Sequence, residues 1–260
     1  MKAQRRQQLK ANSLIWTLQG LPETIKRYQS QIALVLILIA LAIVMIRYRM
    51  NAAEQRLQEA QQSLSIASEE LHHLQMGSYY PGSDPPEYVK RRMEYYSDGL
   101  QQADDALQKA PDSQPALKAE ALLVKGDINF EMANAPEMPG AATQPSLRPP
   151  ETIENLLNNA YDAYMQVLQN YSDQKYAATA AHFGLATVAE DRAVAGGGNN
   201  TSQWDAAKTQ YQAVVDSDAE PGFKAIAAQR IQLLPQLQRP AAIGLSASTM
   251  MTPLGPTTQK

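Results

Sequence analysis

Cysteine is absent from the 260 residues, and histidine and tryptophan are rare, with three and two copies. Without thiols the chain forms no disulfides and performs no thiolate chemistry, which fits an envelope domain stabilised by its core alone. The sequence also contains no Walker A motif, no Gly-x-Ser-x-Gly and no Gly-x-Gly-x-x-Gly. The common nucleotide-binding and hydrolase signatures are therefore missing.

The titratable residues do not form a recognisable catalytic or metal-binding set. His72 and His73 are adjacent on a predicted helix and point about 100° apart, whereas helical metal ligands favour a spacing of about four residues. The pairs Glu69-Glu70 and Asp104-Asp105 diverge in the same way and fit solvated helix faces. We expect no enzyme activity, no cofactor and no metal site.

Long apolar runs are scarce as well, because only Ile32–Ile46 is long and strongly apolar. Extended to Tyr28 and Tyr48 the segment has 21 residues, enough as a helix to cross a hydrocarbon core of about 30 Å. A cleaved signal peptide is the main alternative, but Arg47-Tyr48-Arg49-Met50 stands where a small-residue cleavage site belongs. The sequence predicts a single transmembrane helix over residues 28–48.

Charge is distributed unevenly about this segment. Residues 1–50 carry eight Lys/Arg and one acid, whereas residues 51–260 carry 15 Lys/Arg and 25 Asp/Glu. The basic arm, residues 1–27, is costly to translocate, so we expect a cytoplasmic amino terminus and a domain that crosses the membrane. The arm is interpreted as a topology determinant beside membrane lipid, and not as a nucleic-acid site.

A helical stalk is predicted over residues 49–76. Its apolar residues alternate three and four apart, which is heptad spacing. Such a seam either pairs with a second copy or packs against the first helices of its own domain, and the sequence leaves both open. Ser78–Pro86, rich in proline and glycine, ends the stalk. The seam consists of Leu57, Ala60, Leu64, Ala67, Leu71 and Leu74.

Residues 87–237 are predicted to form an all-α array. Alanine-rich apolar stripes recur at helical spacing, and each helix pair is too thin to bury its apolar face alone. The tail, residues 238–260, lacks a periodic apolar face and is expected to be disordered. The six expected helices are Glu87–Ala110, Gln114–Ala133, Glu151–Tyr171, Gln174–Val194, Gln203–Asp216 and Gly222–Leu237.

Several of these helices resemble tetratricopeptide repeats. The second helix of that repeat has a small residue, an aromatic four later and a compact apolar residue seven later, as at Ala160, Tyr164 and Val167. The set Ala207, Tyr211 and Val214 repeats this pattern. The repeat often has a proline twelve residues after the small one, and an earlier copy, Gly99, Ala103, Ala106 and Pro111, has this proline but lacks the aromatic. Gly126 and Gly184 resemble the glycine that allows close packing in the first helix. The resemblance implies that the aromatic fills the hole between neighbouring pairs.

The layout of basic arm, single membrane helix and tetratricopeptide-like domain resembles the ancillary SecYEG translocon subunit (YfgM-like) family over roughly residues 20–235. That resemblance implies a bacterial inner-membrane protein whose domain faces the periplasm. It also implies protein partners, either the SecYEG translocon or a membrane-bound chaperone.

We therefore expect a membrane-anchored scaffold for protein–protein interactions in translocation or envelope assembly. A chaperone-like holder of unfolded chains is one alternative, and a tether that self-associates through the stalk heptads is another. In a stacked array the first helices line a concave surface, so polar residues on two of them are the predicted partner contacts. These are Lys125, Asn129, His182, Thr187 and Glu190.

Overall fold

The computed structural model describes residues 2–76, 85–135, 151–196, 200–218 and 220–238. The chain divides into two compact units, Met1–Arg56 and Leu57–Lys260. The predicted tail from residue 239 lies outside the described residues, as do residues 77–84, 136–150, 197–199 and 219. The described residues form seven helices, with no strand among them, so the all-α class is confirmed.

The first unit consists of the amino-terminal part of α1 (Lys2–Gln75). From Ala33 to Met50 every side chain is exposed, although the run to Ile46 is apolar throughout. A helix that is apolar on all sides and uncovered by protein has the surface that lipid favours. This is the one described helix long and apolar enough to cross a membrane.

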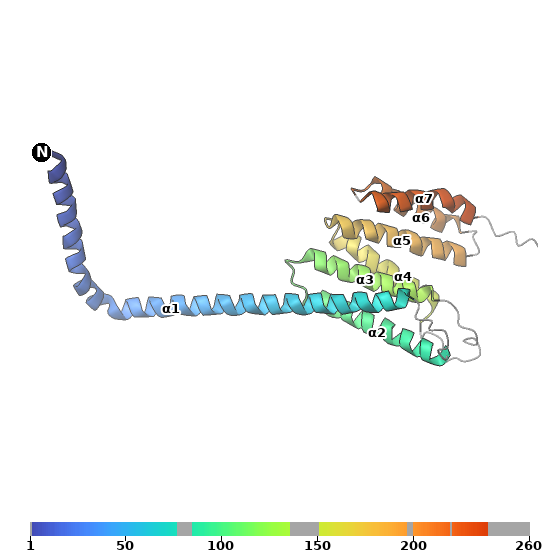
Figure 1. Ribbon diagram of the computed structural model, residues 1–260, viewed down its shortest axis with the longest axis horizontal. Coiled ribbons are helices and arrows are strands. Elements are labelled where there is room, and N and C mark those ends of the chain that lie inside the picture. The colour runs from blue at the N-terminus through green and yellow to red at the C-terminus, as the bar shows by residue number, and fades with distance from the viewer. Residues whose placement is uncertain (1, 77–84, 136–150, 197–199, 219, 239–260) are drawn as a thin grey trace, which may run out of the picture. The chain divides into compact units, whose positions relative to one another are not determined.

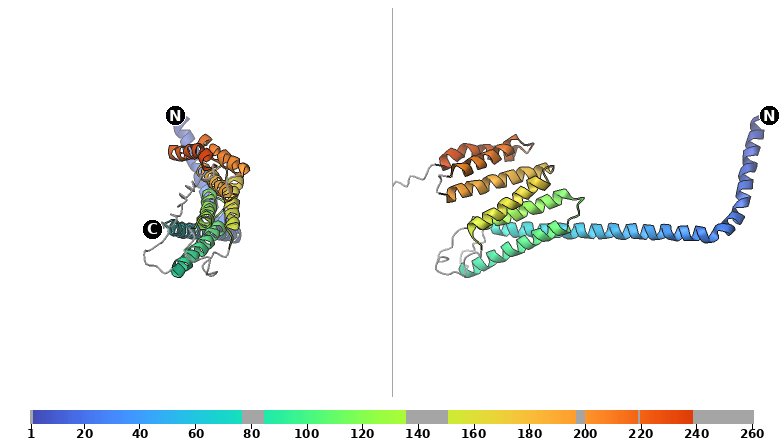
Figure 2. Two further views of the ribbon diagram at one scale, coloured as in Figure 1. Left: turned by 90° about the vertical axis from the view of Figure 1, so that its right-hand side faces the viewer. Right: turned by 180° about the vertical axis from the view of Figure 1, so that it is seen from behind.

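The second unit contains the six predicted helices, each within two residues of its expected bounds. Proline begins α3 and α7, where its missing N–H costs no intrahelical bond. At α4 the Thr152 hydroxyl accepts the Asn155 N–H at 3.2 Å, which is a side-chain N-cap. The helices, stacked in Figures 1 and 2, are α2 (Pro85–Lys109), α3 (Pro115–Ala133), α4 (Ile153–Asn170), α5 (Lys175–Ala195), α6 (Thr201–Asp216) and α7 (Pro221–Leu237).

The heptad seam of the predicted stalk packs into this second unit. The final part of α1 therefore belongs to the array: Leu57–Gln75 and α2 form its first hairpin, followed by α3–α4 and α5–α6, with α7 closing the series. Of the two alternatives for the seam, the structure contains the intramolecular one. The seam residues Ala60, Leu64, Ala67, Leu71 and Leu74 are all buried, and the last four share one hydrophobic cluster with residues of α2 to α5.

Tyr164 joins three helices of the array. Its ring, carried by α4, lies between Gly126 of α3 and Gly184 of α5. A β-carbon added at either glycine would lie 2.5 Å from a ring carbon of Tyr164, so only glycine leaves room for the ring. The aromatic was expected to fill the hole between neighbouring helix pairs, and the glycines were expected to allow close packing. At this joint the Tyr164 ring fills the hole, and both glycines leave room for it.

The first helices of the hairpins run side by side. Gly126 and Gly184 contact the same ring, and the Asn134 amide just after α3 donates to the Asp191 carboxylate near the end of α5, at 2.7 Å. These contacts keep the same order along both helices, so α3 and α5 are parallel. The expected second-helix residues are buried, namely Ala103, Ala106, Ala160, Tyr164, Val167, Ala207, Tyr211 and Val214.

Candidate functional site

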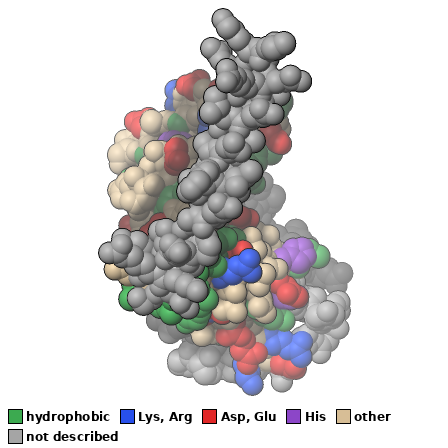
Figure 3. Space-filling model, turned by 90° about the vertical axis from the view of Figure 1, so that its left-hand side faces the viewer, with side chains coloured by type: hydrophobic (Ala, Val, Ile, Leu, Met, Phe, Trp, Pro, Cys, Tyr) green, Lys and Arg blue, Asp and Glu red, His purple; other side chains and the backbone are tan. Residues whose placement is uncertain are grey.

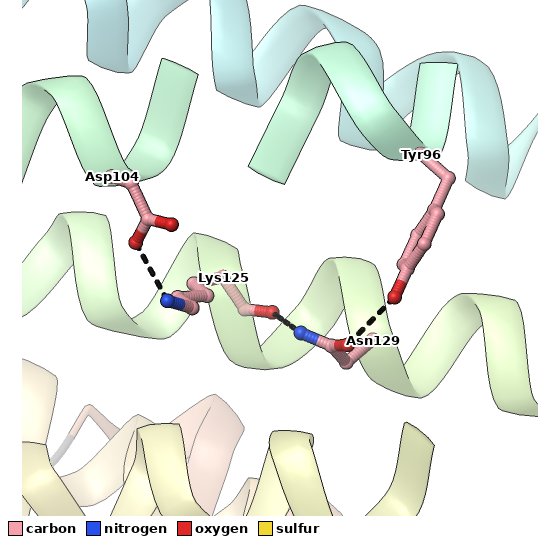
Figure 4. Close-up of polar contacts among 4 residues, drawn as sticks. All are labelled: Tyr96, Asp104, Lys125 and Asn129. Carbon is pink, nitrogen blue, oxygen red and sulfur yellow. Dashed lines mark hydrogen bonds and ion pairs between the residues drawn. The ribbon is translucent and has the colours of Figure 1, made fainter. Parts of the chain in front are cut away.

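Two of the predicted contact residues, Lys125 and Asn129, brace α3 against α2 (Figure 4). The Lys125 ammonium lies 2.6 Å from the Asp104 carboxylate. Asn129 is 1% exposed, accepts the Tyr96 hydroxyl at 3.3 Å and donates to the Lys125 carbonyl at 2.8 Å. A buried amide with both ends hydrogen-bonded stabilises the array and is not available to a partner.

His182 and Thr187 are half-buried on α5 and also bond within the array. His182 Nδ1 lies 2.7 Å from Gln210 Oε1, which links α5 to α6. The Thr187 hydroxyl donates to the Gly184 carbonyl one turn earlier, at 2.8 Å. Both side chains are therefore held in place by neighbours in the protein itself.

Glu190 is buried where α5 meets α6 and α7. Its carboxylate lies 3.6 Å from the Arg230 guanidinium. Burial raises the pKa of Glu190, while the Tyr211 hydroxyl and Arg230 act in the opposite direction. The five predicted residues thus lie on first helices, as expected, but each bonds within the array, and Asn129 and Glu190 are covered.

The sequence analysis missed a half-buried carboxylate, Asp127, beside the Tyr164 joint. Tyr164 donates its hydroxyl to Asp127 Oδ1 at 2.7 Å. Burial raises the pKa of Asp127 to about 6, the hydrogen bond from Tyr164 lowers it, and Glu131 one turn further along α3 raises it. The partners are 37 residues apart in sequence, so no local pattern indicates the pair.

Arg92 is a second residue without a sequence signal. Its guanidinium is buried and donates to the Leu74 carbonyl and the Glu131 carbonyl, both at 3.1 Å. Those carbonyls lie in the last turns of α1 and α3, where helices leave acceptors unpaired and carry partial negative charge. One cation therefore caps two helices.

The charged surface consists mainly of scattered ion pairs. Acidic and basic side chains are interspersed over the described part of the face in Figure 3. His73 stacks on Tyr95, with ring centroids 4.8 Å apart, and its Nε2 lies 3.9 Å from Glu69. Within the described ranges no three His, Asp or Glu side chains form a group that could hold a metal ion.

Exposed apolar side chains gather on α5 and α7. From Leu57 onward, seven large apolar residues of the described chain are exposed, and four of them lie on these two helices. The other three are Met76, Ile153 and Tyr161. We call the set on α5 and α7, together with the half-buried Phe223, the α5–α7 surface: Tyr176, Val194, Phe223, Ile226 and Leu237.

Comparisons with known proteins find no relative. A scan of protein-family models, a search of curated proteins and a search of solved structures each give no match. The fold defines the class of protein. The chain combines a helical-hairpin array with one described helix that is long and apolar enough to cross a membrane.

Proposed function

We propose that this chain is a bitopic membrane protein whose tetratricopeptide-like array is a scaffold for protein–protein interactions in translocation or envelope assembly. In this proposal the basic arm stays in the bacterial cytoplasm, residues 28–48 cross the inner membrane and the array lies in the periplasm. The YfgM-like layout favours the SecYEG translocon or a membrane-bound chaperone as the partner.

One observation supports the proposal most strongly. The five predicted polar contacts bond within the array, whereas large apolar side chains are exposed on α5 and α7. Exposed apolar residues gathered on neighbouring elements are typical of protein-binding surfaces. An uncovered apolar helix in the same chain supports attachment to a membrane.

Single cysteines test both parts of the proposal, because the natural chain has none to interfere. Asn12→Cys in the arm and Asp205→Cys on α6 are labelled in intact cells with a membrane-impermeant maleimide. The proposal predicts that Asp205→Cys is labelled and Asn12→Cys is protected. A photo-cross-linker placed along α3, α5 and α7 should then capture a discrete protein. The reverse labelling pattern would contradict the topology, and the absence of any adduct would contradict the scaffold function.

A chaperone-like holder is the second candidate, because the same exposed apolar residues could bind unfolded chains. A holder should suppress aggregation of an unrelated client, whereas a scaffold should not. Light scattering of heat-denatured citrate synthase with the detergent-solubilised chain distinguishes them. The self-associating tether was based on the heptad seam of the stalk. That seam does not support a tether, because it is buried within the array.

A further inference from the structure

The apolar residues of α5 and α7 follow helical stripes. On α5, Tyr176, Phe183 and Val194 are separated by seven and eleven residues. On α7, Phe223, Ile226 and Leu237 are separated by three and eleven. These intervals are those of heptad positions, so each stripe keeps to one side of its helix. Tyr176 is 71% exposed and Ile226 is 51% exposed, and both lie near the starts of their helices.

Side-chain contacts join the two stripes into one surface. The Phe223 ring meets Tyr176 and Phe183 edge-on, each with ring centroids 6.1 Å apart. Further along, Arg230 of α7 pairs with Glu190 of α5 at 3.6 Å. Since these contacts advance in the same direction along both helices, α5 and α7 are parallel and present their stripes together. The stripe on α5 spans about 27 Å, the length of a helix of about 18 residues.

We infer that the α5–α7 surface binds an amphipathic helix of a partner protein, with basic residues flanking its apolar stripe. This inference rests on the proposed scaffold function and names its docking site. Stripes at heptad spacing match the side-chain spacing of a third helix, whose anchors recur every three or four residues. An extended peptide repeats its side chains every second residue and does not match that spacing.

The net negative charge of the array favours a basic partner helix over an acidic one. Residues 57–237 contain 24 Asp/Glu and 12 Lys/Arg, so the array attracts a basic partner and repels a second copy of itself. Three of the four basic residues of α5 and α7 pair with acids of the array: Lys175 lies 2.6 Å from Asp218, Arg192 lies 3.5 Å from Glu154, and Arg230 lies 3.6 Å from Glu190. The charge of the fourth, Lys224, acts on Asp218 as well. An acidic helix would therefore compete with existing ion pairs, whereas a basic helix is attracted by the excess of acidic residues.

The probe is a synthetic peptide of about 18 residues, with leucine at heptad a and d positions and lysine elsewhere. Its binding to the full chain in phosphatidylcholine nanodiscs is measured by fluorescence anisotropy, with empty nanodiscs subtracted. Two further peptides carry glutamate in place of lysine, or the same residues in scrambled order. We expect the lysine peptide to bind, and the other two to bind at least about tenfold more weakly.

The variant Tyr176→Ser/Ile226→Ser should weaken binding of the lysine peptide by about tenfold or more. Ile153→Ser, at an exposed position on α4, is the matched control and should bind like the natural chain. Thermal unfolding of both variants checks that the fold is retained, as expected for exposed positions. Photo-cross-linking from Tyr176 in native membranes should capture a partner that a probe at Gln212 on α6 does not.

Unchanged binding by the folded double variant would overturn the inference, and so would equal binding of the glutamate peptide. Dimers broken by the double variant, with no peptide binding, would instead assign the surface to a second copy. If probes on α3 capture a partner while those on α5 and α7 capture none, the inference fails and the proposed scaffold function stands.

Discussion

Tyr164 shows how a single aromatic residue fixes the spacing of three helices. Its ring fits only because Gly126 and Gly184 present no side chain to it. The resemblance to a repeated pattern implied that this aromatic fills the hole between helix pairs and that both glycines allow close packing, and the structure shows that the ring contacts both glycines. Its hydroxyl partner, Asp127, was not predicted, because that bond depends on how two distant helices pack.

Gly184→Ala should destabilise the array. The added β-carbon would lie 2.5 Å from Tyr164 Cζ, so the ring must shift at a cost of about 1–3 kcal/mol. Gly222→Ala on α7 is the matched control, because no atom lies within 4 Å of its β-carbon and alanine should stabilise the helix by about 0.5–1 kcal/mol. Urea unfolding of the solubilised chain measures both, and equal effects would contradict the packing.

Asp127→Asn should change how stability depends on pH. Because burial raises the pKa of Asp127 to about 6, the folded protein retains a proton that the unfolded chain releases above its ordinary value of 3.8. The contribution of Asp127 to stability is therefore present at low pH and is lost as pH rises to about 6. Asparagine still accepts the Tyr164 hydroxyl but carries no charge.

We therefore expect the Asp127→Asn variant to be more stable than the natural chain by about 1–3 kcal/mol near pH 7.5, and nearly equal to it near pH 4. Urea unfolding at the two pH values measures the difference. A variant that is less stable at neutral pH would show that the ionised carboxylate stabilises the joint instead.

At the scale of helices, the bounds of α2 to α7 were predictable because proline and apolar periodicity mark them directly. The partner of the α1 seam was not predictable, since heptad spacing is the same whether a helix packs within its own chain or against a second copy. The capping of α1 and α3 by Arg92 could not be predicted either, as its acceptors are 18 and 39 residues away.

Arg92→Met should cost about 3 kcal/mol of stability, because it keeps the length of the side chain and leaves two helix-end carbonyls without their charged donor. Arg91→Met is the matched control: Arg91 is exposed and pairs with Glu87 one turn away, a contact worth less than about 1 kcal/mol. Thermal unfolding followed by circular dichroism compares the two, and similar losses would argue against a special role for Arg92.

Leu71→Ser tests the position of the seam. If Leu71 packs inside the array, the polar substitution should destabilise the fold by about 3 kcal/mol without changing the oligomeric state. A self-associating tether predicts the opposite, namely fewer oligomers and an intact fold. Sedimentation velocity combined with thermal unfolding separates these outcomes, and Ile153→Ser, at an exposed site on α4, controls for general effects of the substitution.

At the scale of the whole molecule, the sequence identified the apolar helix and the all-α array from composition and periodicity alone. It predicted partner contacts at polar residues of α3 and α5, of which Asn129 and Glu190 are buried and bonded within the array. The large apolar residues exposed on α5 and α7 cannot be distinguished in sequence from core residues. Only the packing of neighbouring helices shows which apolar stripe remains uncovered.

The most direct test of the membrane-anchored scaffold is photo-cross-linking from positions along α3, α5 and α7 of the full chain in its own membranes, followed by alkaline extraction and detection of the chain. The account predicts a discrete, larger adduct that remains in the membrane pellet. Release of the chain into the soluble fraction, or a pellet that contains the chain without any adduct, would contradict it.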